Sequence, residues 1–257
     1  MILIFFGLII HYKLSMKNST DKFLKKLTLI LKKISSIQKD KIKLVAKKLS
    51  ENYINGGIVY VFGTGHNHCI AEESLHRAGA FAGTMPILDQ KIDFSHGVKK
   101  SSKYERNPKL AKDILKKYTF SKYDSIIVFS NSGVNQLSVE IAKLLKNKKI
   151  YVISVCSKLY SDSLNKNKNF KLYNYSDINI DNYSPIGDTL IDYNNFGITS
   201  SSTIAGIFIL NSLWYQMALK LKRQIPFPFY KSSNLPGSKN HNKILEKKYN
   251  FINNKLK

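Results

Sequence analysis

The order of apolar and polar residues predicts two amphipathic helices near the start of the chain. Apolar side chains recur at three- and four-residue intervals over residues 23–37, and a second stripe of the same kind runs over 42–53. Asp21 is suited to begin the first helix, and the tripeptide Asn-Gly-Gly at 55–57 ends the second. The spacing therefore predicts a helical hairpin over residues 21–55.

After residue 57 the pattern changes to short apolar runs that alternate with small polar turns and helices. The runs at 58–62 (IVYVF), 125–129 (SIIVF) and 150–155 (IYVISV) have the length and composition of strands buried on both faces. Helices are predicted after the first two runs, over 68–78 and 137–145. This alternation predicts an α/β fold in which helices cover both sides of a parallel sheet.

The last third of the chain contains one long apolar helix. We predict it over residues 204–221, after a small polar turn at 199–203 (TSSST) and before Pro226. A short edge strand is expected at 178–180, and a lysine-rich helix opened by His241 is expected near the end.

The first ten residues (MILIFFGLII) are apolar, but a membrane-spanning helix needs about 20 such residues. No basic segment precedes them and no small-residue cleavage site follows, so a signal peptide is not predicted. We leave 1–20 as an unassigned N-terminal extension and expect translation to begin at Met16. Residues 56–257 are assigned to one domain with a C-terminal helical tail, and no membrane association is expected.

The cysteine count and the excess of lysine limit the kinds of molecule that this protein is expected to bind. Two cysteines exclude a disulfide scaffold and a multi-cysteine zinc fold, and they are typical of the reducing cytoplasm. The net charge of +24 could indicate a polyanionic partner, but only three of the 41 basic residues are arginine. Because nucleic-acid readers use arginine for bidentate contacts, we attribute the lysine excess to compositional bias and expect no nucleic-acid partner. The charge should still attract small anions to a cleft.

Three small polar turns, each at the expected start of a helix, are the strongest functional feature. A helix N-terminus presents unpaired backbone N–H groups and a partial positive charge, which suits a phosphate group. Glycine allows close approach of the backbone, while serine and threonine add hydroxyl donors. For any single turn, helix capping alone explains the same residues. The candidate phosphate-binding residues are Gly63, Thr64, Gly65, His66, Asn67, Ser130, Asn131, Ser132, Gly133, Ser202 and Thr203.

Two nucleotide-binding patterns are incomplete. The turn at 63–67 begins a G-x-G-x-x-G motif, but its sixth position is His68 and no acidic residue follows in a second-strand context. The Gly-Lys-Ser/Thr of an ATP-binding P-loop is also missing from the sequence. We therefore expect neither a nicotinamide nor any other cofactor.

Acidic and histidine side chains after the first turn are candidates for proton transfer. Glu72 or Glu73 could remove a proton next to a carbonyl group, although acids early in a helix also favour its dipole. His68, Glu72 and His76 step by four residues, which could form a metal-binding face. That stripe drifts by about 80° over eight residues, and no H-E-x-x-H pattern is present. We therefore predict no metal, while the histidines at 66, 68 and 76 leave this alternative open.

These motifs together resemble the SIS-domain (sugar isomerase) family. The resemblance rests on residues 56–79 (GGIVYVFGTGHNHCIAEESLHRAG), Ser-Asn-Ser-Gly at 130–133, Ser-Thr at 202–203 and His-Asn at 241–242. The chain is similar above all to phosphosugar-isomerase-like proteins that carry GTGHSH…AEE, SNSG and a late EHN. The resemblance runs from about Lys41 to Tyr249, and Asn67 stands where that group usually has serine.

The resemblance implies a three-layer αβα sandwich around a five-stranded parallel sheet. It further implies a phosphorylated sugar as ligand and assembly as a homodimer or homotetramer. In related isomerases a helical glutamate is the base of an enediol mechanism and a histidine assists ring opening. By this resemblance Glu73 or Glu72 is the base, and His241, reaching a neighbouring subunit, is its acid–base partner.

We therefore predict a cytoplasmic, phosphosugar-binding protein that interconverts an aldose phosphate and a ketose phosphate. Two alternatives stay open. One is a non-catalytic phosphosugar sensor, and the other is an amino-sugar phosphate lyase (etherase) that uses a similar base.

Overall fold

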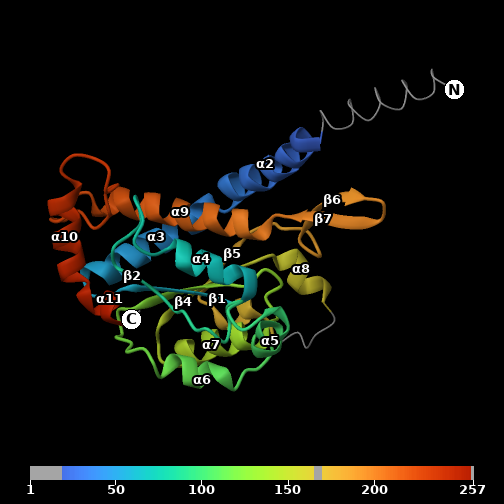
Figure 1. Cartoon of the computed structure of the whole chain (residues 1–257), viewed down its shortest axis with the longest axis horizontal. Coiled ribbons are helices and arrows are strands. Elements are labelled where there is room, and N and C mark those ends of the chain that lie inside the picture. Colours follow the sequence, from blue (N-terminus) through green and yellow to red (C-terminus); the bar gives the residue numbers. More distant parts are fainter. Residues whose placement is uncertain (1–18, 165–169, 256–257) are drawn as a thin grey trace.

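The central element is a parallel sheet between two layers of helices, as a computed structural model of residues 19–164 and 170–255 shows (Figure 1). Its five strands lie in the order β2-β1-β3-β4-β5, and every neighbouring pair is parallel. The strands are β1 (Val59–Gly63), β2 (Thr84–Pro86), β3 (Ser125–Phe129), β4 (Tyr151–Cys156) and β5 (Ile178–Asp181). The predicted three-layer αβα fold is confirmed.

Helices α3, α4 and α9 lie on one side of the sheet, and α6 and α7 lie on the other (Figure 1). The helices are α2 (Ser19–Ile37), α3 (Lys39–Ile54), α4 (His68–Glu73), α5 (Val98–Tyr104), α6 (Leu110–Leu115), α7 (Gln136–Asn147), α8 (Lys158–Ser163), α9 (Ser202–Leu221), α10 (Ser238–Lys248) and α11 (Asn250–Lys255). Two 3-10 turns add η1 (Gly65–Asn67) and η2 (Leu172–Tyr175). Every residue of β1 and β3 is buried, as parallel strands covered on both faces require.

Helix α9 is the one helix in the described part of the chain with the length and composition of a membrane span. It packs along α3, and its residues Leu213 and Met217 are fully buried in the same core as Val45 and Leu49 of α3. Burial in this core accounts for its apolar composition.

Two elements differ from the sequence prediction. Helix α4 ends at Glu73 rather than at residue 78, because His76 and Gly79 adopt positive φ angles of 41° and 81° that a helix cannot accommodate. An antiparallel hairpin, β6 (Thr189–Tyr193) with β7 (Phe196–Ser200), occupies a region where only a turn at 199–203 was predicted. The expectations for residues 1–18 lie outside the described residues.

The start of α9 is held by one carboxylate. Asp188 Oδ1 accepts the backbone N–H groups of Ser201 (3.1 Å) and Ser202 (2.8 Å). The hydroxyl groups of the same two serines donate to Asp188 as well, at 3.1 and 2.6 Å. Asp188 thus ties the base of the β6–β7 hairpin to the positive end of the helix dipole.

We expect Asp188→Ala to lower the free energy of unfolding by about 1–2 kcal/mol, the usual cost of losing a helix N-cap. Urea denaturation followed by circular dichroism measures this change. Asp192→Ala is the matched control, because Asp192 is exposed on β6 and its loss should change stability by less than about 0.5 kcal/mol. Equal stability of the two variants would contradict the capping role.

Candidate functional site

The carboxyl ends of β1 and β3 form the point at which the order of the sheet reverses. The chain passes from β1 to β2 on one side and then returns to place β3 on the other side of β1. Ligands of open α/β sheets bind in the crevice at such a point. Gly63 lies opposite Phe129 in the register, so the turns that follow β1 and β3 are neighbours. The structure thus brings the first two predicted turns together.

The first turn, residues 63–67, depends on its glycines. A Cβ atom on Gly63 would lie 2.3 Å from the carbonyl oxygen of Asn67, a distance that no side chain tolerates. Gly65 has a φ of +57°, and its N–H donates to the carbonyl of Ile92 at 3.1 Å. His68 Nδ1 lies 3.3 Å from the carbonyl oxygen of Gly63. These contacts fold η1 tightly over the end of β1.

The second turn, residues 130–133, is anchored at both ends. The Asn131 carbonyl accepts the N–H of Ser157 at 2.9 Å, and its side-chain oxygen accepts from Asn182 Nδ2 at 3.0 Å. Gly133 has a φ of +63°, and a Cβ atom there would lie 3.1 Å from Ser161 Oγ. The turn therefore leads rigidly into α7.

A polar cavity of about 310 Å³ opens beside this turn. Ser132 lines it together with Arg106 and with Asn135 and Gln136 at the start of α7. Tyr160, Val134 and Leu164 complete the lining. No acidic side chain lines the cavity among the described residues, so it combines a guanidinium, a hydroxyl and a helix N-terminus.

Buried hydroxyl groups without hydrogen-bond partners concentrate around the second turn. Within the described residues they are those of Ser130, Ser138, Ser161 and Ser184. Ser130 begins the turn, Ser138 is in the first turns of α7, and Ser161 Oγ faces Gly133. The N–H of Ser184 donates to Asn182 Oδ1, and Asn182 in turn donates to Asn131. Buried hydroxyls are normally satisfied, so this region has unused hydrogen-bonding capacity.

The third predicted turn meets the first. Ser202 Oγ lies 3.3 Å from His66 Nε2, which in turn lies 3.2 Å from Asn67 Nδ2. The positive end of α9, however, already faces the carboxylate of Asp188. A phosphate at Ser202 or Thr203 would have to displace this carboxylate, and the binding role of both residues stays a prediction.

Glu105, which the sequence analysis did not single out, lies between the first two turns. Its Oε2 atom accepts from Thr64 Oγ1 and from Asn135 Nδ2, both at 3.2 Å. Its backbone carbonyl accepts the N–H of Leu137 in α7 at 3.1 Å. The one sequence signal here was the neighbouring Arg106, one of three arginines in a lysine-rich chain.

None of the predicted acid–base residues lines the polar cavity beside the second turn. Glu73, the last residue of α4, pairs with Arg77 four residues later, and Glu72 is exposed, with Oε1 3.8 Å from His68 Nε2. His241 Nε2 lies 2.9 Å from the carbonyl oxygen of Phe229.

His241 lines an apolar groove of about 940 Å³ with Trp214 and Tyr230. Trp214 is twelve residues along α9 from Ser202, which corresponds to about 18 Å at 1.5 Å per residue. Within one chain, His241 and the serine-rich turns are therefore at different ends of α9.

The histidines considered as a possible metal site do not face one another. His68 is buried beside Gly63, whereas His76 lies 3.1 Å from Glu246 and against the ring of Tyr230. Among the described residues, no three His, Cys, Asp or Glu side chains are grouped as a metal site would need. Cys156, at the end of β4, is also unsuited to ionic chemistry, because burial raises the pKa of its thiol.

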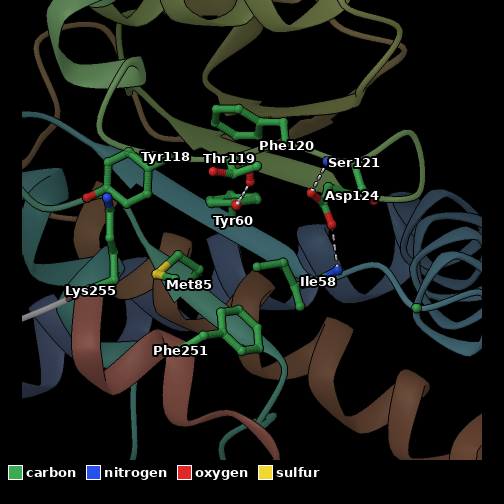
Figure 2. A pocket seen from close by; sticks show the side chains of 11 residues that line it. Ile58, Tyr60, Met85, Tyr118, Thr119, Phe120, Ser121, Asp124, Phe251 and Lys255 are labelled. Carbon is green, nitrogen blue, oxygen red and sulfur yellow. Dashed lines mark hydrogen bonds between the residues drawn. The ribbon is translucent and has the colours of Figure 1, made fainter.

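A second cavity, of about 390 Å³, lies at the opposite edge of the sheet (Figure 2). Figure 2 shows Tyr60, Tyr118 and Phe120 on one side and Phe251 on the other. Its polar groups are engaged: Tyr60 donates to the Thr119 carbonyl at 2.6 Å, and Asp124 accepts the N–H groups of Ile58 and Ser121. Burial raises the pKa of Asp124. The side chains around this cavity hold the amino ends of β1 and β3 in place through these hydrogen bonds.

Comparison with known proteins places this geometry in a family. A SIS domain model matches residues 22–157. A UPF0309 protein of Brucella anthropi is 38% identical over 193 residues, which are 74% of this chain and 79% of that protein. A UPF0309 protein of Halalkalibacterium halodurans is 34% identical over 233 residues, which are 88% of this chain and 93% of that protein.

Solved structures share the fold at low sequence identity. The phosphoheptose isomerase of Neisseria gonorrhoeae superposes with a TM-score of 0.53 at 10% identity, covering 79% of this chain and 98% of that one. A putative phosphosugar isomerase involved in capsule formation from Bacteroides fragilis gives 0.54 at 17% identity, covering 82% and 94%. The family match, the relatives and the shared fold agree, and the chain belongs to the SIS-domain family.

Proposed function

We propose that this protein binds a phosphorylated sugar in the crevice between β1 and β3, with the phosphate at the turn of residues 130–133. The observation that carries the proposal is the polar cavity where Ser132, Arg106 and the start of α7 converge. Of the three predicted turns, the first has Glu105 against Thr64 and the third has Asp188 against Ser202. Among the described residues no carboxylate bonds to residues 130–133, and Arg106 lies beside Ser132, which favours the second turn for an anion. The Glu105 carboxylate reaches this side only at Asn135.

The family gives independent support for this ligand. SIS domains take their name from sugar isomerases, and the solved structures with the same fold are named as a phosphoheptose isomerase and a putative phosphosugar isomerase. We extend the proposal to a cytoplasmic homodimer or homotetramer that interconverts an aldose phosphate and a ketose phosphate.

In this reaction a base removes the proton from the carbon next to the carbonyl group, and an acid protonates the carbonyl oxygen to give an enediol. The hydroxyl group on the deprotonated carbon then gives its proton to the conjugate base of the acid and becomes the new carbonyl group, while the base returns its proton to the former carbonyl carbon. Glu73 or Glu72 is the proposed base and His241 the proposed acid. Since His241 is distant from the turns within one chain, it would serve the crevice of a second subunit.

We expect a sugar phosphate to raise the melting temperature, and the parent sugar without phosphate to leave it unchanged. A ligand that binds only the folded state adds about 2.7 kcal/mol of stability at a hundredfold excess over Kd. Ser132→Ala removes a hydroxyl donor from the cavity and should weaken binding about 3- to 10-fold, the equivalent of about 1 kcal/mol.

Ser163→Ala is the control for this experiment, because Ser163 is an exposed residue of α8 whose hydroxyl donates to its own helix. A panel of sugar phosphates that produces no shift in the native protein would remove the proposal. If Ser132→Ala leaves the ligand-induced rise in melting temperature unchanged, the phosphate would have to bind at another turn.

We expect Glu73→Gln to retain sugar-phosphate binding and to reduce isomerase turnover by 100-fold or more, since amide nitrogen and oxygen cannot accept the substrate proton. Solvent deuterium incorporation into the sugar measures the proton transfer directly. Glu72→Gln on the same helix is the matched variant. Turnover by the native protein that neither variant reduces would exclude both glutamates as the base, and binding without turnover would favour the sensor.

A further inference from the structure

The connection between β2 and α6 carries two adjacent residues of opposite charge into the crevice. Glu105 and Arg106 follow α5 and precede α6. The Glu105 side chain contacts Thr64 of the first turn and Asn135 at the start of α7, whereas Arg106 lines the polar cavity beside Ser132. The backbone of this segment is fixed to α7 by the hydrogen bond from the Leu137 N–H to the Glu105 carbonyl. One short segment therefore places a guanidinium on the polar cavity and a carboxylate beside it, against Thr64 and the cavity-lining Asn135.

The carboxylate of Glu105 has unused hydrogen-bonding capacity. Both of its side-chain hydrogen bonds, from Thr64 and Asn135, reach the same atom, Oε2. Within residues 19–164 and 170–255 no partner contacts Oε1, and no Lys, Arg or His pairs with Glu105. A carboxylate offers about four acceptor positions, so the side chain can accept further donors.

The backbone around Glu105 leaves room for its carboxylate. Gly65 adopts a left-handed φ of +57°, and a Cβ atom there would lie 3.3 Å from Glu105 Oε2. The Glu105 side chain is half-buried rather than sealed from solvent. The carboxylate is therefore open to solvent in part, and Oε1 carries no hydrogen bond within the described residues.

The negative charge of the Glu105 carboxylate determines which part of a phosphorylated sugar it can contact. It repels a phosphate group, but it accepts strong hydrogen bonds from neutral hydroxyl groups. Arg106 and Ser132 have the opposite preference, for the anion. The two ends of a phosphorylated sugar match these two positions.

We propose that Glu105 is the specificity residue of the crevice and accepts hydrogen bonds from the hydroxyl groups of the sugar. This inference rests on the proposed function and deepens it by assigning the recognition of sugar and phosphate to different residues. A binding experiment that separates the two parts of the ligand tests it.

The probes are methyl phosphate, which has no sugar hydroxyls, and four sugar phosphates: D-glucose 6-phosphate, D-fructose 6-phosphate, D-arabinose 5-phosphate and N-acetyl-D-glucosamine 6-phosphate. Calorimetry at constant ionic strength gives Kd for each probe with the full chain. We expect the native protein to prefer at least one sugar phosphate over methyl phosphate.

Glu105→Gln should weaken binding of that sugar phosphate about fivefold, since a hydrogen bond to a charged acceptor exceeds a neutral one by about 1 kcal/mol. It should leave the affinity for methyl phosphate unchanged or raise it, because one negative charge is lost. Arg106→Ala should weaken the binding of both the sugar phosphate and methyl phosphate. Glu140→Gln is the charge-matched control on α7 and should change neither the affinity for the sugar phosphate nor that for methyl phosphate.

Two results with Glu105→Gln would overturn the inference while leaving phosphosugar binding intact. One is an equal loss of affinity for the sugar phosphate and for methyl phosphate, and the other is an unchanged preference for the sugar phosphate. A native protein that binds methyl phosphate as tightly as every sugar phosphate would also overturn it. A native protein that binds none of the five probes would overturn the proposed function itself.

Discussion

The constraint on which the site depends is the parallel pairing of β1 with β3. All ten residues of these strands are buried, because helices cover both faces of the sheet. No side chain of their central residues can therefore meet a ligand, and only the segments beyond Gly63 and Phe129 remain available. Since the two strands are parallel and in register, those segments leave the sheet at the same edge. The crevice is a consequence of topology before any polar residue is considered.

Close packing of α9 adds the third turn to this edge. A Cβ atom on Gly206 would lie 2.5 Å from Ile70 Cδ1 and 3.4 Å from Phe129 Cδ1. The missing side chain lets the helix approach α4 and the end of β3, which brings Ser202 next to His66. Asp188 then fixes the first turn of α9. Capping at Ser202 and packing at Gly206 thus act on the first five residues of α9, and the position of Ser202 follows from both.

The strands and the first two turns could be predicted because continuous apolar runs and glycine-containing turns are local signals. The strand β2 has only three residues and ends in Pro86, so it left no comparable pattern. Glu105 could not be predicted, because its position depends on a long connection whose path is set by contacts with Thr64 and Asn135, far away in the sequence. The predicted base Glu73 illustrates the opposite problem. Its helix was identified, but the helix ends at Glu73 itself, so the ion pair with Arg77 forms beyond that end, where helical spacing predicts no contact.

Net charge and local charge have different effects in this protein. A formal charge of +24 favours the approach of any anion, but it cannot distinguish one phosphate compound from another. Discrimination has to come from the few charges inside the crevice, and two of these, Glu105 and Asp188, are negative. Each disfavours an anion next to its own carboxylate, and the proposed phosphate position is the cavity of Arg106 and Ser132, where no acidic side chain lines the wall among the described residues. In a strongly basic chain, carboxylates are therefore the residues that can define where an anion does not bind, and so fix the orientation of a ligand that has one charged end.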